Sequence, residues 1–476
     1  MRLLLVLLFA CISVGSAFAQ PKNVVFILSD DHRYDFFSAH PNAPDFLNTP
    51  AMDRMAREGA HLSNAFVTTA LCSPSRASIL TGQYAHNHGV VDNSTDIPEG
   101  TRFFPEDLQE AGYNTAYIGK WHMGDDSDDP RAGFDRWVSF KGQGTYFDPN
   151  LNVDGERRNP EGYTSDILTE YALDFLQEQN GEEPFFMILS HKAVHAEFMP
   201  APRHQGAYAD IDIPYPASMP NTARNYWGKP EWVKKQRGSW HGVDYMYQGA
   251  LEFDGFYRRY AETLLGLDES IGRVIEQLDT SGLAENTLVI YMGDNGFLLG
   301  EHGLIDKRNA YEESMRVPML AWSPGYVEAG TTIDGLVRNI DIASTIYELT
   351  GVESRLVNMD GSSFLGLLEG EAPNDEGREF LYQYYWEHAF PHTPTTFALR
   401  GNQYKYIYYH GVWDRDELYD LTNDPQEMVN LAEVPAFAET ARAMRQRLYD
   451  LLEAEDAMRV PMRRGTWSAD EWLLDK

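Results

Sequence analysis

The stretch that decides the fold is Val24-Val25-Phe26-Ile27-Leu28-Ser29-Asp30-Asp31. Five consecutive apolar residues, most of them β-branched, predict a short strand that is buried on both faces, as in the middle of a parallel sheet. Two carboxylates follow this strand almost directly. Because ligands of open α/β sheets bind beyond the carboxyl ends of the strands, the acidic pair lies where a functional site is expected.

Three later segments repeat the pattern of an apolar strand that ends in polar residues. They are residues 114–120, which run into a loop after Lys120, residues 185–189, followed by His191 and His195, and residues 288–292, followed by Asp294 and Asn295. Amphipathic helices are expected between them, and the clearest has apolar residues at helical spacing over 264–278 with a stop at Gly282. The alternation predicts the α/β class, with a doubly wound, mainly parallel sheet flanked by helices.

The length of 476 residues predicts a large domain followed by a smaller one. We predict a catalytic domain over residues 20–370, whose last element is a helix at 341–349. An aromatic-rich insertion at about 200–254 interrupts it. The C-terminal subdomain, residues 371–476, is predicted to be α+β, because aromatic strand-like segments at 380–386, 397–409 and 417–420 precede a helix at about 436–452. These segments suggest a small antiparallel sheet with one helix packed on it.

The first residues predict export. Residues 1–19 combine a charged start at Arg2, a short apolar run and the ending Ala17-Phe18-Ala19, which is typical of a secretory signal cleaved before Gln20. The apolar run is too short to span a membrane, and no later segment approaches the roughly 20 apolar residues that a span needs. An alternative is lipidation of Cys11, which would anchor the protein. Either reading predicts a periplasmic or secreted protein.

The formal net charge of −33 limits the partners. Such a charge repels DNA, RNA and anionic lipid, so we expect no nucleic-acid partner. It also repels a sulfated polyanion, so a substrate of that kind must meet a local cationic pocket.

Cysteine is scarce, and the position of one cysteine is informative. Cys11 lies in the predicted leader, so Cys72 has no intramolecular disulfide partner. A free cysteine commonly packs as a small hydrophobe. Here it opens the motif Cys72-Ser73-Pro74-Ser75-Arg76, and a helix over 74–81 would place Arg76 near a helix start that favours anions. The neighbours therefore favour chemistry over packing.

Two acidic or amide pairs each follow a buried strand, namely Asp30-Asp31 and Asp294-Asn295. Either pair alone would be read as a solvated turn. Together they offer hard oxygen ligands without histidine or thiolate, which suits Ca²⁺ or Mg²⁺ and disfavours zinc and copper.

The cysteine motif resembles the signature of the formylglycine-dependent (type I) sulfatases of the alkaline phosphatase superfamily. Residues 112–122, which read GYNTAYIGKWH, resemble the second signature of that family. The resemblance runs from Asn23 to the terminal helix and shows no departure at the core positions. Residues 70–88 are most similar to sulfatases that act on sulfated glycans, including glucosamine 6-sulfatases.

The resemblance implies a modified nucleophile on a metal ion. It implies that a maturation enzyme converts Cys72 to formylglycine (3-oxoalanine), whose hydrate attacks a sulfate ester. It also implies that a divalent ion, usually calcium, is held by the modified Cys72 and the following side chains: Asp30, Asp31, Asp294 and Asn295.

Further roles are implied for cationic and histidine side chains. Arg76 would hold the loop of the nucleophile, and Lys120 and His122 would bind sulfate. His195 would contact the leaving-group oxygen, with His191 as the alternative for that role.

Residues 300–318 resemble the loop that follows the metal ligands in the family. Lys307 would then be a second sulfate-binding lysine. The sequence leaves open whether its neighbour Arg308 is the pocket cation instead.

These features predict an exported sulfatase that hydrolyses sulfate esters of carbohydrates. We expect the aromatic residues of the insertion to form part of the wall of the substrate site: Tyr208, Tyr215, Tyr226, Trp227, Trp232 and Trp240. One alternative is an arylsulfatase or a phosphonate or phosphate monoester hydrolase on the same scaffold. Phosphatases of this group usually bring serine or threonine as nucleophile and histidine among more metal ligands, so cysteine favours sulfate. A different class is an unmodified, inactive chain that binds sulfated glycan.

Overall fold

A computed structural model describes residues 20, 22–124, 127–374, 378–411 and 415–461. The predicted leader 1–19, with Cys11, lies outside the described residues. So do residues 375–377, which belong to the segment that we expected to join the two domains. The division near residue 370 stays a prediction.

The centre of the molecule is a ten-stranded sheet with the order β11-β2-β10-β9-β1-β8-β4-β5-β6-β7. Its strands are β1 (Asn23–Ser29), β2 (Ala60–Leu62), β4 (Asn114–Lys120), β5 (Arg136–Phe140), β6 (Leu151–Val153), β7 (Glu156–Arg158), β8 (Phe185–Ser190), β9 (Thr287–Gly293), β10 (Met319–Trp322) and β11 (Thr331–Ile333). The five strands β9, β1, β8, β4 and β5 run parallel, and the sheet continues through antiparallel pairs, β9 with β10 on one side and β5 with β6 on the other. The two-residue strands β3 (Ala65–Phe66) and β12 (Val337–Arg338) pair with each other in a separate two-stranded sheet. The predicted fold class is confirmed.

The central strand β1 is buried on both faces, as its apolar run predicted. Val24, Phe26 and Leu28 belong to the core on one side of the sheet, while Val25 and Ile27 belong to the core on the other. This alternation is the period of two that a pleated strand imposes on its side chains. Burial of both faces is why the run reads as continuously apolar.

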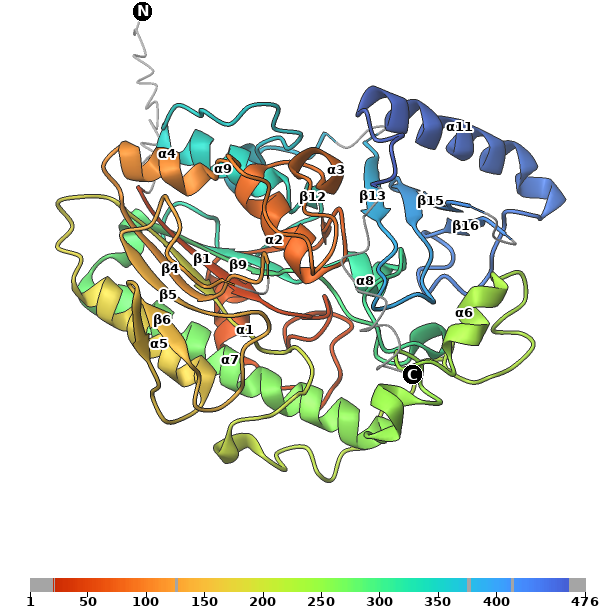
Figure 1. The fold of residues 1–476 in the computed structure, drawn as a ribbon, viewed down its shortest axis with the longest axis horizontal. Coiled ribbons are helices and arrows are strands. Elements are labelled where there is room, and N and C mark those ends of the chain that lie inside the picture. The colour runs from red at the N-terminus through yellow and green to blue at the C-terminus, as the bar shows by residue number, and fades with distance from the viewer. Residues whose placement is uncertain (1–19, 21, 125–126, 375–377, 412–414, 462–476) are drawn as a thin grey trace, which may run out of the picture.

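Helices cover both faces of the sheet (Figure 1). One layer contains α2 (Cys72–Thr81), α4 (Phe104–Glu110) and α9 (Asp341–Thr350), and the other contains α1 (Pro50–Glu58), α5 (Thr164–Gln177) and α7 (Phe253–Ser281). The shorter helices are α3 (Ala85–His88), α6 (Glu231–Gln236), α8 (Glu312–Met315) and α10 (Leu365–Leu368). The long helix α7 ends at Gly282, which caps it with a φ of 72°. That end agrees with the predicted stop.

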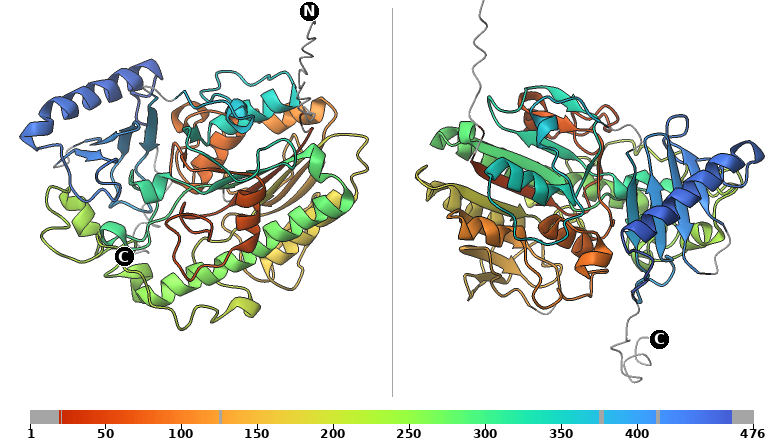
Figure 2. Two further views of the ribbon diagram at one scale, coloured as in Figure 1. Left: turned by 180° about the vertical axis from the view of Figure 1, so that it is seen from behind. Right: turned by 90° about the horizontal axis from the view of Figure 1, so that it is seen from above.

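The C-terminal part folds on a second, antiparallel sheet beside the first (Figures 1 and 2). Its order is β13 (Phe380–Tyr384), β14 (Thr396–Arg400), β15 (Tyr404–Tyr409) and β16 (Glu417–Asp420). Helix α11 (Ala438–Ala454) packs on it through Met444, Leu448 and Leu452. The predicted small sheet with one helix is confirmed.

Several predicted boundaries were wrong by a few residues. The helix expected over 74–81 begins at Cys72, because Pro74 lacks only an N–H that a first turn leaves unbonded. The helix expected over about 436–452 is α11, which spans Ala438–Ala454. The helix at 341–349 is not the last element of the large domain, since α10 follows it.

The insertion at 200–254 has little regular structure, as expected, and its last two residues already belong to α7. Its aromatic side chains divide into two groups. Tyr208 and Trp232 are buried and pack against other parts of the chain, Tyr208 on Phe46 and Trp232 on Tyr409, whereas Tyr215, Trp227 and Trp240 are exposed. No helix within the described ranges is both long and apolar enough to cross a bilayer.

Candidate active site

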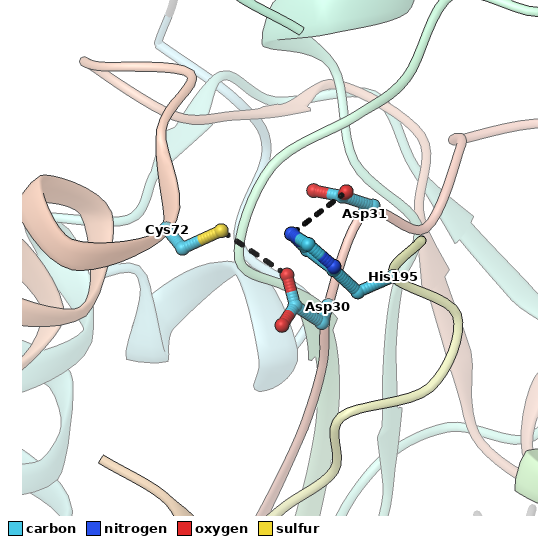
Figure 3. Close-up of side chains that lie close together, drawn as sticks. All are labelled: Asp30, Asp31, Cys72 and His195. Carbon is cyan, nitrogen blue, oxygen red and sulfur yellow. Dashed lines mark hydrogen bonds and ion pairs between the residues drawn. The ribbon is translucent and has the colours of Figure 1, made fainter. Parts of the chain in front are cut away.

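The site is built where β1 and β9 end beside the first turn of α2. Ser29 of β1 pairs with Gly293 of β9, so the next residues, Asp30 and Asp294, leave the sheet side by side. Cys72 is the first residue of α2 and is fully buried. Figure 3 shows its side chain directed at Asp30, with Asp31 and His195 close by. The expected convergence of residues far apart in sequence is therefore present.

The Cys72 sulfur lies among charged groups. Its thiol donates to Asp30 Oδ1 at 3.2 Å, and Lys307 Nζ donates to the sulfur at 2.8 Å. Lys307 also pairs with Asp31, and Lys120 pairs with Asp30. The sulfur thus has a carboxylate and an ammonium group as direct neighbours.

Three of the predicted metal ligands, Asp31, Asp294 and Asn295, also form hydrogen bonds with one another. The backbone N–H of Asp31 donates to Asp294 Oδ1 at 3.1 Å, and Asn295 Nδ2 donates to Asp31 Oδ1 at 2.7 Å. Asn295 Oδ1 is buried and has no hydrogen-bond partner within the part of the chain that the structure describes. An orphaned buried carbonyl beside three buried carboxylates fits a hard cation.

A further grouping supports a cation at this point. Ligand atoms of Asp30, Asp31, Cys72 and His195 all lie within 4.8 Å of one another. These residues could therefore hold a divalent ion. Such an ion would share the carboxylates with the ammonium groups of Lys120 and Lys307, which pair with Asp30 and Asp31.

The pKa values of the cluster follow from burial and charge. Burial raises the pKa of Asp294 to about 6, and the Asp30 carboxylate adds to this effect. Burial opposes ionisation of Asp30, but the positive charges around it, that of Lys120 foremost and those of Arg76 and Lys307 with it, together outweigh burial, so the pKa of Asp30 lies well below its usual value. Burial raises the pKa of the Cys72 thiol strongly. Since the thiolate is the nucleophilic form, an unmodified Cys72 is a poor nucleophile in this pocket.

Arg76 ties three strand ends together. Its Nε donates to Asp294 Oδ2 at 3.0 Å, and its Nη1 donates to the Lys120 carbonyl at 2.6 Å and to Ser190 Oγ at 2.5 Å. These acceptors follow or end β9, β4 and β8. The guanidinium group, one turn into α2, therefore fixes the helix that begins at Cys72 against the sheet.

Lys120 and His122 leave the end of β4 together and are both buried. The turn depends on Gly119, whose φ is 119° and whose Cβ, if present, would lie 1.8 Å from the Ser190 carbonyl oxygen. Lys120 Nζ donates to Gln143 Oε1 at 2.5 Å, and Gln143 Nε2 lies 3.2 Å from His122 Nε2. Sequence reasoning missed Gln143, which lies outside both signatures. Its only sequence signal is its place just after β5, the strand paired with β4.

His195, and not His191, belongs to the cluster. The segment after β8 continues beside Asp30, whose carbonyl accepts from the Val194 N–H at 2.7 Å. His195 Nδ1 donates to the Ala196 carbonyl at 2.6 Å, which leaves Nε2 facing Asp31 Oδ2 at 3.8 Å. His191 Nε2 instead lies 3.0 Å from Ser270 Oγ on α7. The alternative role for His191 is not supported.

Lys307 and Arg308 diverge, although they are neighbours in sequence. Lys307 reaches Cys72, whereas Arg308 donates to Glu387 Oε1 at 2.7 Å and to Asp306 Oδ1 at 2.9 Å. The Arg308 guanidinium lies 3.7 Å from the centre of the Phe390 ring. Of the two cations, only Lys307 contacts Cys72.

The insertion and the C-terminal subdomain meet next to Arg308. Trp240 stacks on Phe390 with ring centres 5.6 Å apart and planes 4° from parallel, and His241 stacks on the same ring at 4.6 Å. An aromatic wall from two distant segments therefore borders the residue that follows Lys307.

Comparisons with known proteins agree with this geometry. The family model described as "Sulfatase" matches residues 22–352, and one described as the C-terminal part of N-sulphoglucosamine sulphohydrolase matches residues 300–454. The N-acetylglucosamine-6-O-sulfatase of Bacteroides thetaiotaomicron is 32% identical, over 93% of this chain and 88% of its own. Human N-acetylglucosamine-6-sulfatase is 29% identical, over 90% of this chain and 85% of its own.

A solved structure of a protein with a bound sulfated sugar agrees with these matches to sulfatases. A protein in complex with its substrate D-glucosamine-2-N,6-O-disulfate superposes with a TM-score of 0.85 and 30% identity, covering 93% of this chain and all of the other. With Cys72, a carboxylate cluster and two lysines in one pocket, the chain belongs to the sulfatase family of the alkaline phosphatase superfamily and is a sulfuric ester hydrolase.

Proposed function

We propose that this protein hydrolyses sulfate esters of carbohydrates, and that its substrate carries a 6-sulfate on glucosamine. The observation that carries the proposal is the meeting of Cys72, Lys307 and the carboxylate cluster in one buried pocket. The substrate class rests on the relatives, two of which are named as N-acetylglucosamine-6-sulfatases. It also rests on the solved structure with bound glucosamine disulfate.

We assign the metal site to the four side chains that follow β1 and β9, and we favour Ca²⁺ over Mg²⁺. Asp30, Asp31, Asp294 and Asn295 would supply oxygen ligands, including the unbonded Asn295 Oδ1. When bound, such an ion neutralises sulfate charge and lowers the pKa of a hydroxyl beside it.

We propose that the nucleophile is formylglycine made from Cys72 by a maturation enzyme, and that it supplies the attacking hydroxyl group. The strongly raised pKa of the thiol supports a modified residue, since the thiol itself would rarely ionise. Arg76 keeps this position in place through its bonds to Asp294, Lys120 and Ser190.

The chain's other polar residues bind and orient the substrate. Lys120 and Lys307 direct ammonium groups into the pocket from two sides and bind the sulfate oxygens. His195 presents Nε2 to the departing sugar oxygen, because its Nδ1–H is committed to the Ala196 carbonyl, and it donates a proton from Nε2 when the ring is in its doubly protonated imidazolium form. Arg308, held beside the wall of Trp240 and Phe390, contacts the sugar beyond the sulfate group.

We further propose that the protein acts in the periplasm or outside the cell, where polysaccharides are met. The leader predicted over residues 1–19 supports this location.

The proposal is tested with a panel of defined substrates. Sulfate release is measured from glucosamine 6-sulfate, with and without N-acetyl or N-sulfate groups, from sugars sulfated elsewhere, from nitrophenyl sulfate and from a phosphonate monoester. We expect the highest kcat/KM for a glucosamine 6-sulfate. Faster turnover of the aryl or phosphonate compound than of every sugar would overturn the carbohydrate assignment.

The unmodified, inactive alternative is tested separately by intact-mass analysis. Conversion of cysteine to formylglycine lowers the mass of the chain by about 18 Da. An active preparation that keeps the full cysteine mass would contradict the proposed nucleophile.

A further inference from the structure

We infer that Gln143 is a positioning residue of the sulfate site, which aims the Lys120 ammonium and determines which nitrogen of His122 carries hydrogen. This inference rests on the proposed sulfate-binding role of Lys120 and His122. Gln143 lies between them, with Oε1 2.5 Å from Lys120 Nζ and Nε2 3.2 Å from His122 Nε2. It is half-buried at the edge of the pocket, whereas its two partners are fully buried.

The chemistry of Lys120 determines the orientation of the Gln143 amide. An ammonium group has three donors and no acceptor, so it must face the amide oxygen. The amide NH₂ group of Gln143 then faces His122 Nε2. Because that NH₂ group can only donate, Nε2 must accept, and the single hydrogen of the neutral ring is placed on Nδ1.

The same bond leaves Lys120 with a defined free donor. One N–H of the ammonium faces Asp30 and a second faces Gln143. The third N–H is available for a sulfate oxygen. Among the residues that the structure describes, Asp30 alone would hold the ammonium if Gln143 were removed, and the direction of the ammonium toward the sulfate would no longer be determined.

The loop that carries Gln143 is built to hold this position. Gly142 and Gly144 flank it with φ of 53° and 65°, in the left-handed region that favours glycine. A Cβ on Gly144 would lie 2.3 Å from the Phe140 ring. Beyond the loop, the Thr145 carbonyl accepts from Thr164 Oγ1 at 2.7 Å, which anchors it to α5.

The test uses Gln143→Glu and Gln143→Met. Glutamate keeps the acceptor for Lys120 but has no N–H for His122, so we expect the hydrogen of His122 to appear on Nε2. Methionine keeps the length and removes both bonds. We expect either change to lower kcat/KM on the order of 10- to 100-fold, with the thermal midpoint unchanged.

The decisive measurement is the tautomer of His122 by ¹⁵N NMR on histidine-labelled protein. A His122→Gln variant identifies its signals among the 14 histidines. This readout needs no turnover, so it stays valid even if the substrate assignment fails. We expect Nδ1–H in the unmutated protein and a shift toward Nε2–H in Gln143→Glu.

Gln179 offers a matched control at the opposite end of β4. It is also half-buried, accepts from Asn114 Nδ2 at 3.2 Å and donates to the Phe175 carbonyl at 2.7 Å. Gln179→Glu and Gln179→Met should leave the His122 signals and kcat/KM unchanged. An unchanged His122 tautomer in Gln143→Glu, or equal losses of activity in the Gln179 variants, would overturn the inference.

Discussion

At the scale of single residues, Cys72 combines full burial with a place among charged groups. Its sulfur contacts Asp30 and Lys307, and burial keeps the thiol neutral. A side chain that only packed there would be replaceable by a smaller apolar one at little cost in function. The two readings of Cys72, packing or chemistry, therefore make opposite predictions.

We predict that Cys72→Ala abolishes sulfate release while the fold is kept. Alanine removes the attacking group, which should cost several orders of magnitude in kcat. Because alanine removes only the sulfur atom, the lost packing should cost on the order of 1 kcal/mol. Turnover and the thermal midpoint are measured on the same preparation. Sulfate release near the unmutated rate would refute the assignment.

Lys307 and Arg308 should separate sulfate binding from sugar binding. Lys307→Met is expected to lower kcat/KM on the order of 100- to 1,000-fold for every sulfate ester, because it removes a donor beside the reacting group. Arg308→Met should lower kcat/KM for a sugar sulfate much more than for nitrophenyl sulfate. The Arg308 side chain faces Phe390 and Glu387, where we expect the sugar and not the sulfate group to bind. Equal losses on both substrates for Arg308→Met would contradict the division of roles.

The site residues that could be placed from the sequence are those that lie at the ends of predicted strands. Asp30 and Asp294 were placed correctly because both directly follow buried parallel strands, and such ends share one edge of the sheet. The choice between Lys307 and Arg308 was open because adjacent residues of an irregular segment can point either way. Gln143 was missed because its loop is brought to Lys120 only by the pairing of β4 with β5.

At the scale of elements, strands were easier to predict than helix ends. The apolar runs of β1, β8 and β9 are limited by polar residues, so their bounds were nearly right. The start of α2 was harder to predict, because its N-cap residue is Leu71, whose side chain forms no capping hydrogen bond. A polar N-cap residue would have marked the start in the sequence. Helix α10 was missed because its four residues carry too little periodicity.

The short helix α8 makes the stability of the protein depend on pH. Burial, and then the Glu301 carboxylate, raise the pKa of Glu313 on this helix to about 8. An unfolded glutamate has a pKa of about 4.3. Between these values the folded state holds a proton that the unfolded state releases, so the contribution of Glu313 to the free energy of unfolding falls as pH rises from about 5 to 8.

We therefore predict that Glu313→Gln raises the thermal midpoint at pH 8.5 and has little effect at pH 5. At pH 8.5 the free energy of unfolding should rise by on the order of 1–3 kcal/mol, because the variant has no charge to bury. Glu276→Gln on the exposed face of α7 is the matched control and should change neither midpoint. Thermal melts of the three proteins at both pH values check this. The same gain at both pH values would show that the charge of Glu313 is not the cause.

At the scale of the whole molecule, the fold should survive removal of a metal ion although the activity should not. Lys120 and Lys307 pair with Asp30 and Asp31, so the carboxylates keep cationic partners. We expect a chelator to abolish sulfate release without changing the circular dichroism spectrum at 25 °C. Calcium should restore activity better than magnesium, because flexible carboxylate and amide oxygens suit the larger ion.

Asn295→Ala sharpens the chelation test. It removes the unbonded buried Oδ1 and should raise the calcium concentration needed for half of the maximal activity. Full activity of the chelated protein, or an unchanged calcium requirement in Asn295→Ala, would argue against a metal at this position.

The burial of α2 also limits the time during which Cys72 is accessible to another protein. All ten residues of α2 are buried, and some of their covering partners, such as Lys307 and Asn339, lie 235 and 264 residues further along the chain than Cys72 and Ser75. At about 5–20 residues per second, the ribosome needs on the order of tens of seconds to make that span. The proposed maturation enzyme can reach Cys72 only before these later residues cover α2, so a folded chain that still has its thiol should keep it in intact-mass analysis even with the enzyme added.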